Sequence, residues 1–80
     1  MKNIIIKKNE KVPPSVVIFK KKNDIDLVIE KLKDNKPVIA NLSSLNKADA
    51  HRIVEFLSGF CYAKNGNYKK IDELIYRFEI

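Results

Sequence analysis

The stretch HRIVEFLSGFCYAKNG, residues 51–66, holds the only histidine, the only cysteine and both glycines of the chain. A cysteine becomes an effective nucleophile when a neighbouring histidine takes its proton, so catalysis is the first hypothesis to test here. His51 and Cys61 are ten residues apart on one predicted helix, which separates them by about 15 Å at 1.5 Å per residue. Cys61 also falls on the apolar stripe of that helix, where it acts as a small hydrophobic side chain. We therefore expect no catalytic residues and no enzymatic activity.

The other polar residues form no phosphate-binding or metal-binding motif. Gly59 and Gly66 stand alone rather than in a glycine-rich loop, and one cysteine cannot supply a Cys/His set with zinc spacing. Five acidic residues occupy predicted cap or turn positions, namely Asp24, Asp26, Asp49, Asp72 and Glu73. We expect no metal and no cofactor. The single unpaired cysteine is consistent with a cytoplasmic protein.

The net charge of +6 makes nucleic acid the obvious alternative partner. However, 14 of the 16 basic residues are Lys, and only Arg52 and Arg77 offer bidentate phosphate contacts. A composition rich in Lys, Asn and Ile is typical of an AT-rich genome. The run Lys20–Lys22 has no interleaved aromatic residue and is more typical of a solvated connection than of a phosphate site. We expect no nucleic acid as partner and keep a small basic nucleic-acid-binding α/β domain as the alternative function.

Eighty residues correspond to one domain, which we place at residues 15–80 after a short lead-in, residues 1–14. In the lead-in, Ile4–Ile6 could form a short strand that Pro13 and Pro14 isolate. Residues 15–20 form an apolar run that predicts a strand buried on both faces or nearly so. A helical stripe follows, and residues 37–42 predict a second strand, which together make a βαβ unit with parallel strands. The stripe consists of Ile25, Val28, Ile29 and Leu32, capped at Asn23 or Asp24 and ended by Asn35 and Pro37.

The second helix is predicted to begin after Asn46, with Asp49 at the third helical position as an acidic variant of the capping box. Its apolar stripe consists of Ala50, Ile53, Val54, Leu57 and Cys61. The helix should end near Lys64, where Asn65 and Gly66 supply the left-handed residues of a structural turn. The last residues predict a hairpin with its turn at Asp72–Glu73. Because the order is β-α-β-α-β-β, we expect a two-layer α/β sandwich whose mixed sheet carries both helices on one face.

Two features predict surfaces that a partner covers. Phe56 and Phe60 widen the apolar surface of the second helix around Gly59, and a glycine within a helix costs about 1 kcal/mol relative to alanine. We interpret Gly59 as a point of close approach by another chain, in a dimer. In the hairpin, two short helices cannot hide all the large side chains, namely Tyr68, Ile75, Tyr76 and Phe78.

These residues resemble the core domain of the SepF family, cell-division proteins that tether FtsZ filaments to the membrane. The resemblance covers about residues 15–80, and the spacing from Leu45 to Gly66 is kept without a gap. The matching positions are Val16–Phe19, Pro37–Leu42, Leu45, Asn46, Ala50, Arg52, Glu55–Leu57, Gly59, Tyr62, Ala63 and Gly66.

The resemblance implies a homodimer that binds the C-terminal tail of FtsZ at the division site, in a groove to which the second helix and the hairpin contribute. By position, it implies Lys70 and Tyr76 on the hairpin, with Phe56 and Phe60 on the helix, as peptide-binding residues. The FtsZ tail is a short acidic and apolar peptide, which suits a lysine beside an aromatic ring. Family members usually begin with an amphipathic membrane-targeting helix and a long linker. The 14-residue lead-in is too short for both, so we expect no direct membrane binding by this chain as given.

Overall fold

The computed structural model describes residues 13–80, which form four strands, two α-helices and a short 3-10 helix. Their order is β1 (Ser15–Ile18), η2 (Lys22–Asp24), α1 (Ile25–Lys33), β2 (Val38–Asn41), α2 (Lys47–Ala63), β3 (Asn67–Asp72) and β4 (Ile75–Glu79). This confirms the predicted alternation of strands and helices and the closing hairpin. The strand expected at Ile4–Ile6 lies outside the described residues.

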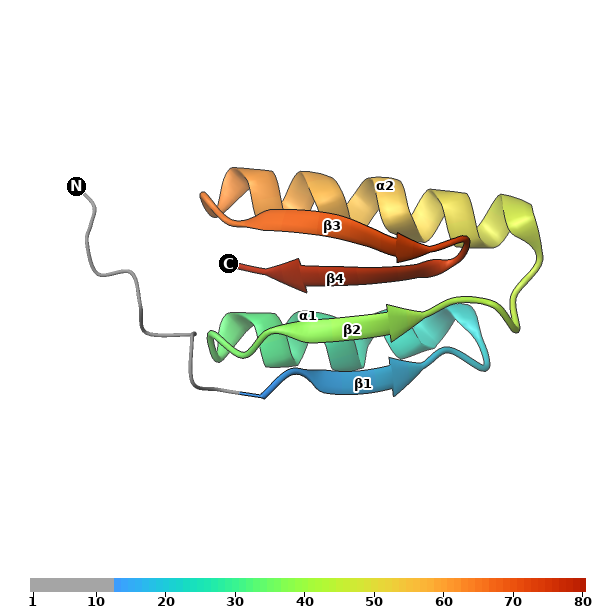
Figure 1. The fold of residues 1–80 in the computed structure, drawn as a ribbon, viewed down its shortest axis with the longest axis horizontal. Helices are drawn as coiled ribbons and strands as arrows, with labels where there is room; N and C mark the ends of the chain where they lie inside the picture. Colours follow the sequence, from blue (N-terminus) through green and yellow to red (C-terminus); the bar gives the residue numbers. More distant parts are fainter. Residues whose placement is uncertain (1–12) are drawn as a thin grey trace.

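The strands form one mixed sheet in the order β1-β2-β4-β3. β1 pairs in parallel with β2, whereas β4 pairs antiparallel with both β2 and β3. Both helices lie on the same face of the sheet, with α1 behind β2 and α2 running along the β3–β4 hairpin (Figure 1). The predicted two-layer α/β sandwich is therefore confirmed, with α1 as the crossover between the two parallel strands.

The predicted capping residues stand at the ends of the helices, but Asp24, which precedes α1, makes no capping hydrogen bond with its side chain. The side-chain oxygen of Asn46 accepts a hydrogen bond from the backbone N–H of Asp49 at 2.8 Å, which caps the start of α2. Asn35 and Asn65 follow the two helices with φ angles of 62° and 63°, the left-handed conformation that ends a helix. Gly66 has no positive φ, so the expectation that it shares the left-handed turn with Asn65 is wrong.

The prediction that the first strand is buried on both faces is also wrong. β1 ends at Ile18 and alternates, with Val17 buried and its neighbours Val16 and Ile18 exposed. Successive side chains of a strand point to opposite faces, and both helices of the described chain cover the same one. The apolar run in the sequence therefore supplies more hydrophobic surface than one copy of residues 13–80 buries.

The hairpin turn lies at Glu73 and Leu74, one residue later than predicted. β3 contains a bulge, because Lys70 pairs with Tyr76 while Asp72 pairs with Ile75, which leaves Ile71 as the extra residue. The bulge carries Asp72 into the strand and moves the turn onward.

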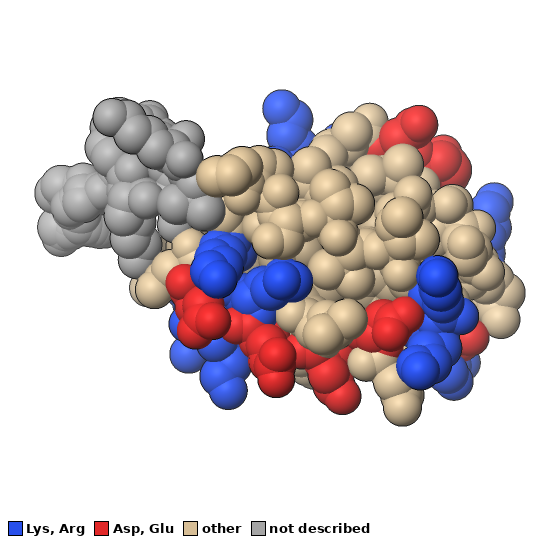
Figure 2. All heavy atoms as spheres, turned by 90° about the horizontal axis from the view of Figure 1, so that it is seen from below, with Lys and Arg blue, Asp and Glu red and all other residues tan. Residues whose placement is uncertain are grey.

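We call the side of the sheet away from the helices the open face. Cross-strand pairing places Val16 beside Ile39 and Asn41 beside Ile75 on it, and Arg77 beside Ile39. Seen from the β1 edge, most charged side chains lie along the lower margin of the view, a few lie at the upper margin and at the right end, and a broad area between them is uncharged (Figure 2).

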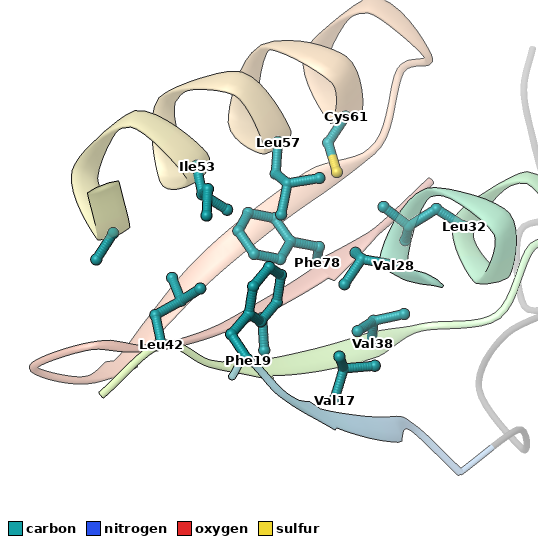
Figure 3. Close-up of a cluster of buried hydrophobic side chains, with 12 residues drawn as sticks. Val17, Phe19, Val28, Leu32, Val38, Leu42, Ile53, Leu57, Cys61 and Phe78 are labelled. Carbon is teal, nitrogen blue, oxygen red and sulfur yellow. The ribbon is translucent and has the colours of Figure 1, made fainter. Parts of the chain in front are cut away.

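The opposite face of the sheet forms the core with the helices (Figure 3). The core side chains come from β1, α1, β2, α2 and β4 and from the residues just after β1 and β2, namely Val17, Phe19, Val28, Leu32, Val38, Ala40, Leu42, Ala50, Ile53, Leu57, Cys61 and Phe78. The rings of Tyr68 and Tyr76 flank Phe78 at centroid distances of 6.2 and 6.1 Å. The hairpin therefore carries a row of three rings on its helix-facing side, of which the central one is fully buried.

Candidate functional site

The stretch with the histidine and the cysteine is one uninterrupted helix followed by a cap. His51 lies in its first half and is exposed, whereas Cys61 lies near its end in the core. Ten residues of helix separate the two side chains by about 15 Å. Burial raises the pKa of the Cys61 thiol, which disfavours the reactive thiolate. His51 and Cys61 therefore do not form a nucleophile and base.

Within residues 13–80, no three His, Cys, Asp or Glu side chains are grouped so that they could hold a metal ion. The same part of the chain contains no helix that is long and apolar enough to cross a bilayer. The other polar side chains of residues 13–80 lie at the surface of the domain.

The loop of three lysines before α1 is held by an acid. The carboxylate of Asp24 accepts hydrogen bonds from the backbone N–H groups of Lys20 and Lys21 at 2.7 and 3.2 Å. The bond from Lys20 is the main cause that lowers the pKa of Asp24. The side chain of Lys22 approaches Asp49 at 4.0 Å. The backbone donors of this loop are thus partly occupied within the chain, which agrees with a solvated connection.

Two of the predicted peptide-binding residues lie together. Lys70 and Tyr76 are directly opposite in the β3–β4 pairing, so their side chains share one face of the hairpin. This is the helix-facing side, because Tyr76 stacks on the buried Phe78. Lys70 lies on an edge strand and is exposed, and it forms no ion pair among residues 13–80. The pair offers a free ammonium group beside a half-buried ring.

The other two predicted residues lie elsewhere on α2. Ser58 and Tyr62 define the flank of α2 beside β3, because they line a hollow together with Asn67 and Tyr68. A side chain two residues away on a helix points about 200° around the axis. Phe56 and Phe60 therefore lie on the opposite flank, where Phe56 is 54% exposed and Phe60 packs partly against the core. The structure does not bring them to the side of α2 that borders β3.

The hollow beside β3 is a feature that the sequence interpretation missed. It has a volume of about 180 Å³ and is lined by Ser58, Tyr62, Gly66, Asn67 and Tyr68. The side chain of Tyr62 is 84% exposed and that of Tyr68 is 51% exposed. The signal in the sequence was Tyr62 itself, since it is a large aromatic residue that lies off the apolar stripe of its helix.

The two glycines differ in what surrounds them. A Cβ atom added to Gly59 would have no heavy atom of the described chain within 4 Å. A Cβ atom added to Gly66 would clash with the carbonyl oxygen of Glu79 and lie 2.5 Å from Cα of Ile80. Close backbone approach within the chain therefore occurs at Gly66, and close approach to Gly59 by a second chain stays a prediction.

The open face is the second surface that one copy leaves uncovered. Val16 is 63% exposed and Ile18 is 55% exposed, and Ile39 and Ile75 on the neighbouring strands are half-buried. The charged groups Arg77 and Glu79 on β4 neutralise each other, with Nη1 of Arg77 donating to Oε1 of Glu79 at 2.6 Å. The face is therefore apolar at the β1 edge and carries a neutralised charge pair on β4, with the exposed Lys69 on β3 at the other edge.

The fold and these surfaces define a small α/β-sandwich domain with exposed apolar side chains on the hairpin, on α2 and on the open face. A family model described as Cell division protein SepF matches residues 15–78, and the chain belongs to this family.

Relatives with the same description are similar over much of the domain. A Cell division protein SepF of Thermoanaerobacter sp. (strain X514) is 47% identical over 49 residues, which cover 61% of this chain and 36% of the relative. One from Acetivibrio thermocellus is 46% identical over 54 residues, covering 68% of this chain and 35% of the relative. Cell division protein SepF 2 of Desulforamulus reducens is 40% identical over 55 residues, covering 69% and 34%. The chain thus spans about a third of the length of the relatives it matches.

Proposed function

We propose that this domain is a non-enzymatic adaptor of cell division that binds the C-terminal tail of FtsZ and associates with a second copy of itself at the cytoplasmic division site. Membership of the SepF family supports the role in division. The observation that carries the binding proposal is the pair of Lys70 and Tyr76, which share the helix-facing side of an exposed hairpin. An acidic and apolar peptide is complementary to a free lysine beside an aromatic ring.

The open face supports self-association. More than half of Val16 and of Ile18 is exposed to water on this face, although strands of a parallel pair are usually covered on both sides. A second copy is the occupant we propose, because the apolar β1 edge can pack against itself, Arg77 and Glu79 neutralise each other, and Lys69 lies on β3 at the far edge of the sheet. The outer side of α2 around Gly59 is the alternative surface for the same association.

The binding proposal is tested by titrating a fluorescently labelled FtsZ-tail peptide with the protein. We expect Lys70→Glu to weaken binding at least tenfold, because it replaces an attractive charge by a repulsive one at an exposed position where the fold does not depend on it. Tyr76→Ala should weaken binding as much, with a modest loss of thermal stability because the ring stacks on Phe78.

His51→Ala and Cys61→Ala are the controls for the opening stretch. Both should bind the peptide within about twofold of the parent. Only Cys61→Ala should lower the free energy of unfolding, by the roughly 1–2 kcal/mol typical of a small buried side chain. Loss of binding in the two controls, with Lys70→Glu unaffected, would overturn the adaptor hypothesis. Tight, strongly salt-dependent binding to a DNA duplex would favour the nucleic-acid alternative instead.

A further inference from the structure

The connection between α2 and β3, which we call the α2–β3 joint (residues 64–66), contains the only Asn-Gly pair of the chain, Asn65–Gly66. Asn65 has a φ of 63°, and its backbone N–H donates to the carbonyl oxygen of Tyr62 at 3.0 Å. The backbone N–H of Gly66 donates to the carbonyl oxygen of Cys61 at 2.7 Å. A left-handed residue together with these two bonds forms the Schellman motif, which ends the helix.

The fold favours these two residue types at these two positions. The left-handed residue after a helix is usually Gly, and Asn is among the few residues with a side chain that adopt this conformation readily. The next residue has no room for a Cβ atom, which would clash with the carbonyl oxygen of Glu79 and lie 2.5 Å from Cα of Ile80. A glycine is therefore needed at position 66 because of its contact with the end of β4, and not because of its own φ.

Asn followed by Gly is the dipeptide most prone to spontaneous deamidation, because glycine has no side chain to shield its backbone nitrogen. After the nitrogen of Gly66 loses its proton, it attacks the side-chain carbon Cγ of Asn65. A bond from this nitrogen to Cγ forms, the bond from Cγ to Nδ2 breaks, and Nδ2 gains a proton and leaves as ammonia. One water molecule then adds to either carbonyl carbon of the resulting succinimide and gives an aspartyl or an isoaspartyl residue. Such reactions make Asn a thermolabile residue.

Asn65 is exposed to water, but the backbone of the joint resists the attack. The proton that Gly66 must lose lies in the 2.7 Å hydrogen bond to Cys61, so a base reaches it only after this bond has opened. The backbone is also held on the other side of the joint, because Asn67 pairs with Glu79 at the start of β3. A group protected in this way reacts only as often as the local structure opens.

We infer that Asn65–Gly66 is a site of deamidation by solvent water, and that opening of the α2–β3 joint sets its rate. The contact of Gly66 with the end of β4 makes the reactive pair necessary. The hydrogen bond of the Gly66 nitrogen withholds the nucleophile while the joint is closed. Because the ammonia is lost to solvent, each conversion is a lasting record of an opening.

The two products affect the fold differently. An isoaspartyl residue carries the main chain through Cβ and Cγ, which lengthens the backbone ahead of β3 by one carbon atom. The pairing of Tyr68 with Phe78 and the bond from Gly66 to Cys61 then no longer fit together. An aspartyl residue keeps the backbone length and adds a negative charge at the C-terminal end of α2, which the helix dipole disfavours. We expect the isoaspartyl product to loosen β3 from β4 and the aspartyl product to leave the hairpin paired.

The rate is measured by incubating the full chain in mildly alkaline buffer, with and without urea, and mapping its peptides by mass spectrometry. We expect Asn65 to convert at least tenfold more slowly in the folded chain than in urea. Asn35 is the matched control, because it has a φ of 62° at the end of α1 and the N–H of the next residue, Lys36, donates to the carbonyl oxygen of Lys31 at 3.0 Å in the same motif. In urea, Asn35 should convert at least tenfold more slowly than Asn65, and Lys36→Gly should remove this difference.

Three further variants test the role of the joint. Tyr68→Ala removes a ring that stacks on Phe78 at the start of the hairpin, and Leu27→Ala removes a side chain of similar exposure from α1. In the folded chain, we expect Tyr68→Ala to raise the conversion rate of Asn65 at least threefold and Leu27→Ala to leave it unchanged. Asn65→Gly keeps a residue suited to the left-handed conformation, so it should abolish conversion at this position while the melting temperature stays close to that of the parent.

The outcomes decide each part of the inference. Conversion of Asn65 in the folded chain as fast as in urea would show that the joint gives no protection. Equal acceleration by Tyr68→Ala and Leu27→Ala would show that opening of the joint does not set the rate. The isoaspartyl form is then separated by chromatography, and the hydrogen exchange of its β3 amides is compared with that of Asn65→Asp. Loss of protection in the isoaspartyl form alone supports the expected loosening of β3, and equal protection in both forms would overturn it.

Discussion

The two faces of the sheet are built from the same strands but differ in how far their side chains are buried. On the helix-facing side, Val17, Val38 and Phe78 are buried beneath α1 and α2. On the open face, Val16 and Ile18 alternate with these residues along the chain and remain largely in water. At the β1 edge both faces carry aliphatic side chains, so composition does not explain the difference there. What differs is that the described chain supplies helices for one face and no cover for the other.

This difference sets the expected strength of self-association. Burying a whole Val or Ile side chain contributes about 1.5–3 kcal/mol, and somewhat more than half of Val16 and Ile18 remains to be buried. Each would thus contribute roughly 1 kcal/mol per copy, with smaller additions from Ile39 and Ile75. Association costs roughly 4–15 kcal/mol in lost translational and rotational freedom. These side chains alone barely offset that cost, so we expect a weak, concentration-dependent dimer rather than a permanent one.

The largest loss of stability should come from removing a side chain on the helix-facing side of the sheet. Phe78→Ala should destabilise the monomer by about 3–5 kcal/mol, because it opens a cavity beneath both helices. Ile75→Ala on the open face of the same strand should cost about 1 kcal/mol or less. Urea unfolding at low protein concentration, where dimers do not contribute, measures both.

A loss of 3–5 kcal/mol is a large part of the stability of a domain this small, and Phe78→Ala could fail to fold. Phe78→Leu then keeps the comparison, with an expected loss of about 1–1.5 kcal/mol, close to a volume-conserving change. Equal losses for Phe78→Leu and a conservative Ile75→Val change would show that the two faces are equally packed and would contradict the comparison.

The next effect concerns association rather than folding. Ile18→Lys places a charge on the open face, and we expect it to raise the dimer dissociation constant at least tenfold while the melting temperature of the monomer changes little. Analytical ultracentrifugation over a range of concentrations measures this.

Two further lysine variants make the result specific. Leu27→Lys is the control, because Leu27 is a half-exposed residue on α1 and lies away from the open face. Gly59→Lys tests the alternative surface on α2, where the added side chain meets open space in a single copy. If Gly59→Lys dissociates the dimer and Ile18→Lys does not, the copies meet through α2 and the open face has another role.

The fold could be predicted from the sequence because its determinants are local. The change from strand to helical periodicity, the Asn46 cap and the left-handed Asn35 are all set by neighbouring residues, and each appears where the pattern places it. The turn of the hairpin was misplaced by one residue because the bulge at Ile71 depends on pairing with a different strand. Register is a tertiary property that the residues of one strand do not specify alone.

The candidate site was predicted less completely, for the same physical reason. The family resemblance implied Lys70 and Tyr76, and the β3–β4 pairing brings them together. A turn at Asp72–Glu73 would have paired Lys70 with Ile75 instead, so it is the bulge at Ile71 that puts Lys70 opposite Tyr76. The position of a residue around α2 relative to β3, in contrast, depends on how the helix packs on the sheet. Phe56 and Tyr62 are both exposed aromatic residues of α2, and only the packed structure shows that Tyr62 is the one beside the hairpin.

The smallest expected effect on stability comes from the loop that connects β1 to α1. Asp24 lies where the chain passes from the sheet to α1, and its carboxylate accepts hydrogen bonds from the backbone of Lys20 and Lys21, which lower its pKa. A carboxyl whose pKa is lower in the folded than in the unfolded state stabilises the fold above the unfolded pKa, near 3.9, and this contribution is lost as the pH falls through the folded value.

Asp24→Asn should therefore be less stable than the parent at pH 6, and the difference should shrink below pH 4. Urea unfolding from pH 6 to pH 2.5 measures it, with Asp26→Asn as the control that removes the same charge from the first turn of α1 without touching the loop. Because Asp24 is exposed to solvent, the difference should be small beside that of Phe78→Ala, and a difference that persists unchanged to pH 2.5 would show that the ionised carboxylate does not hold the loop.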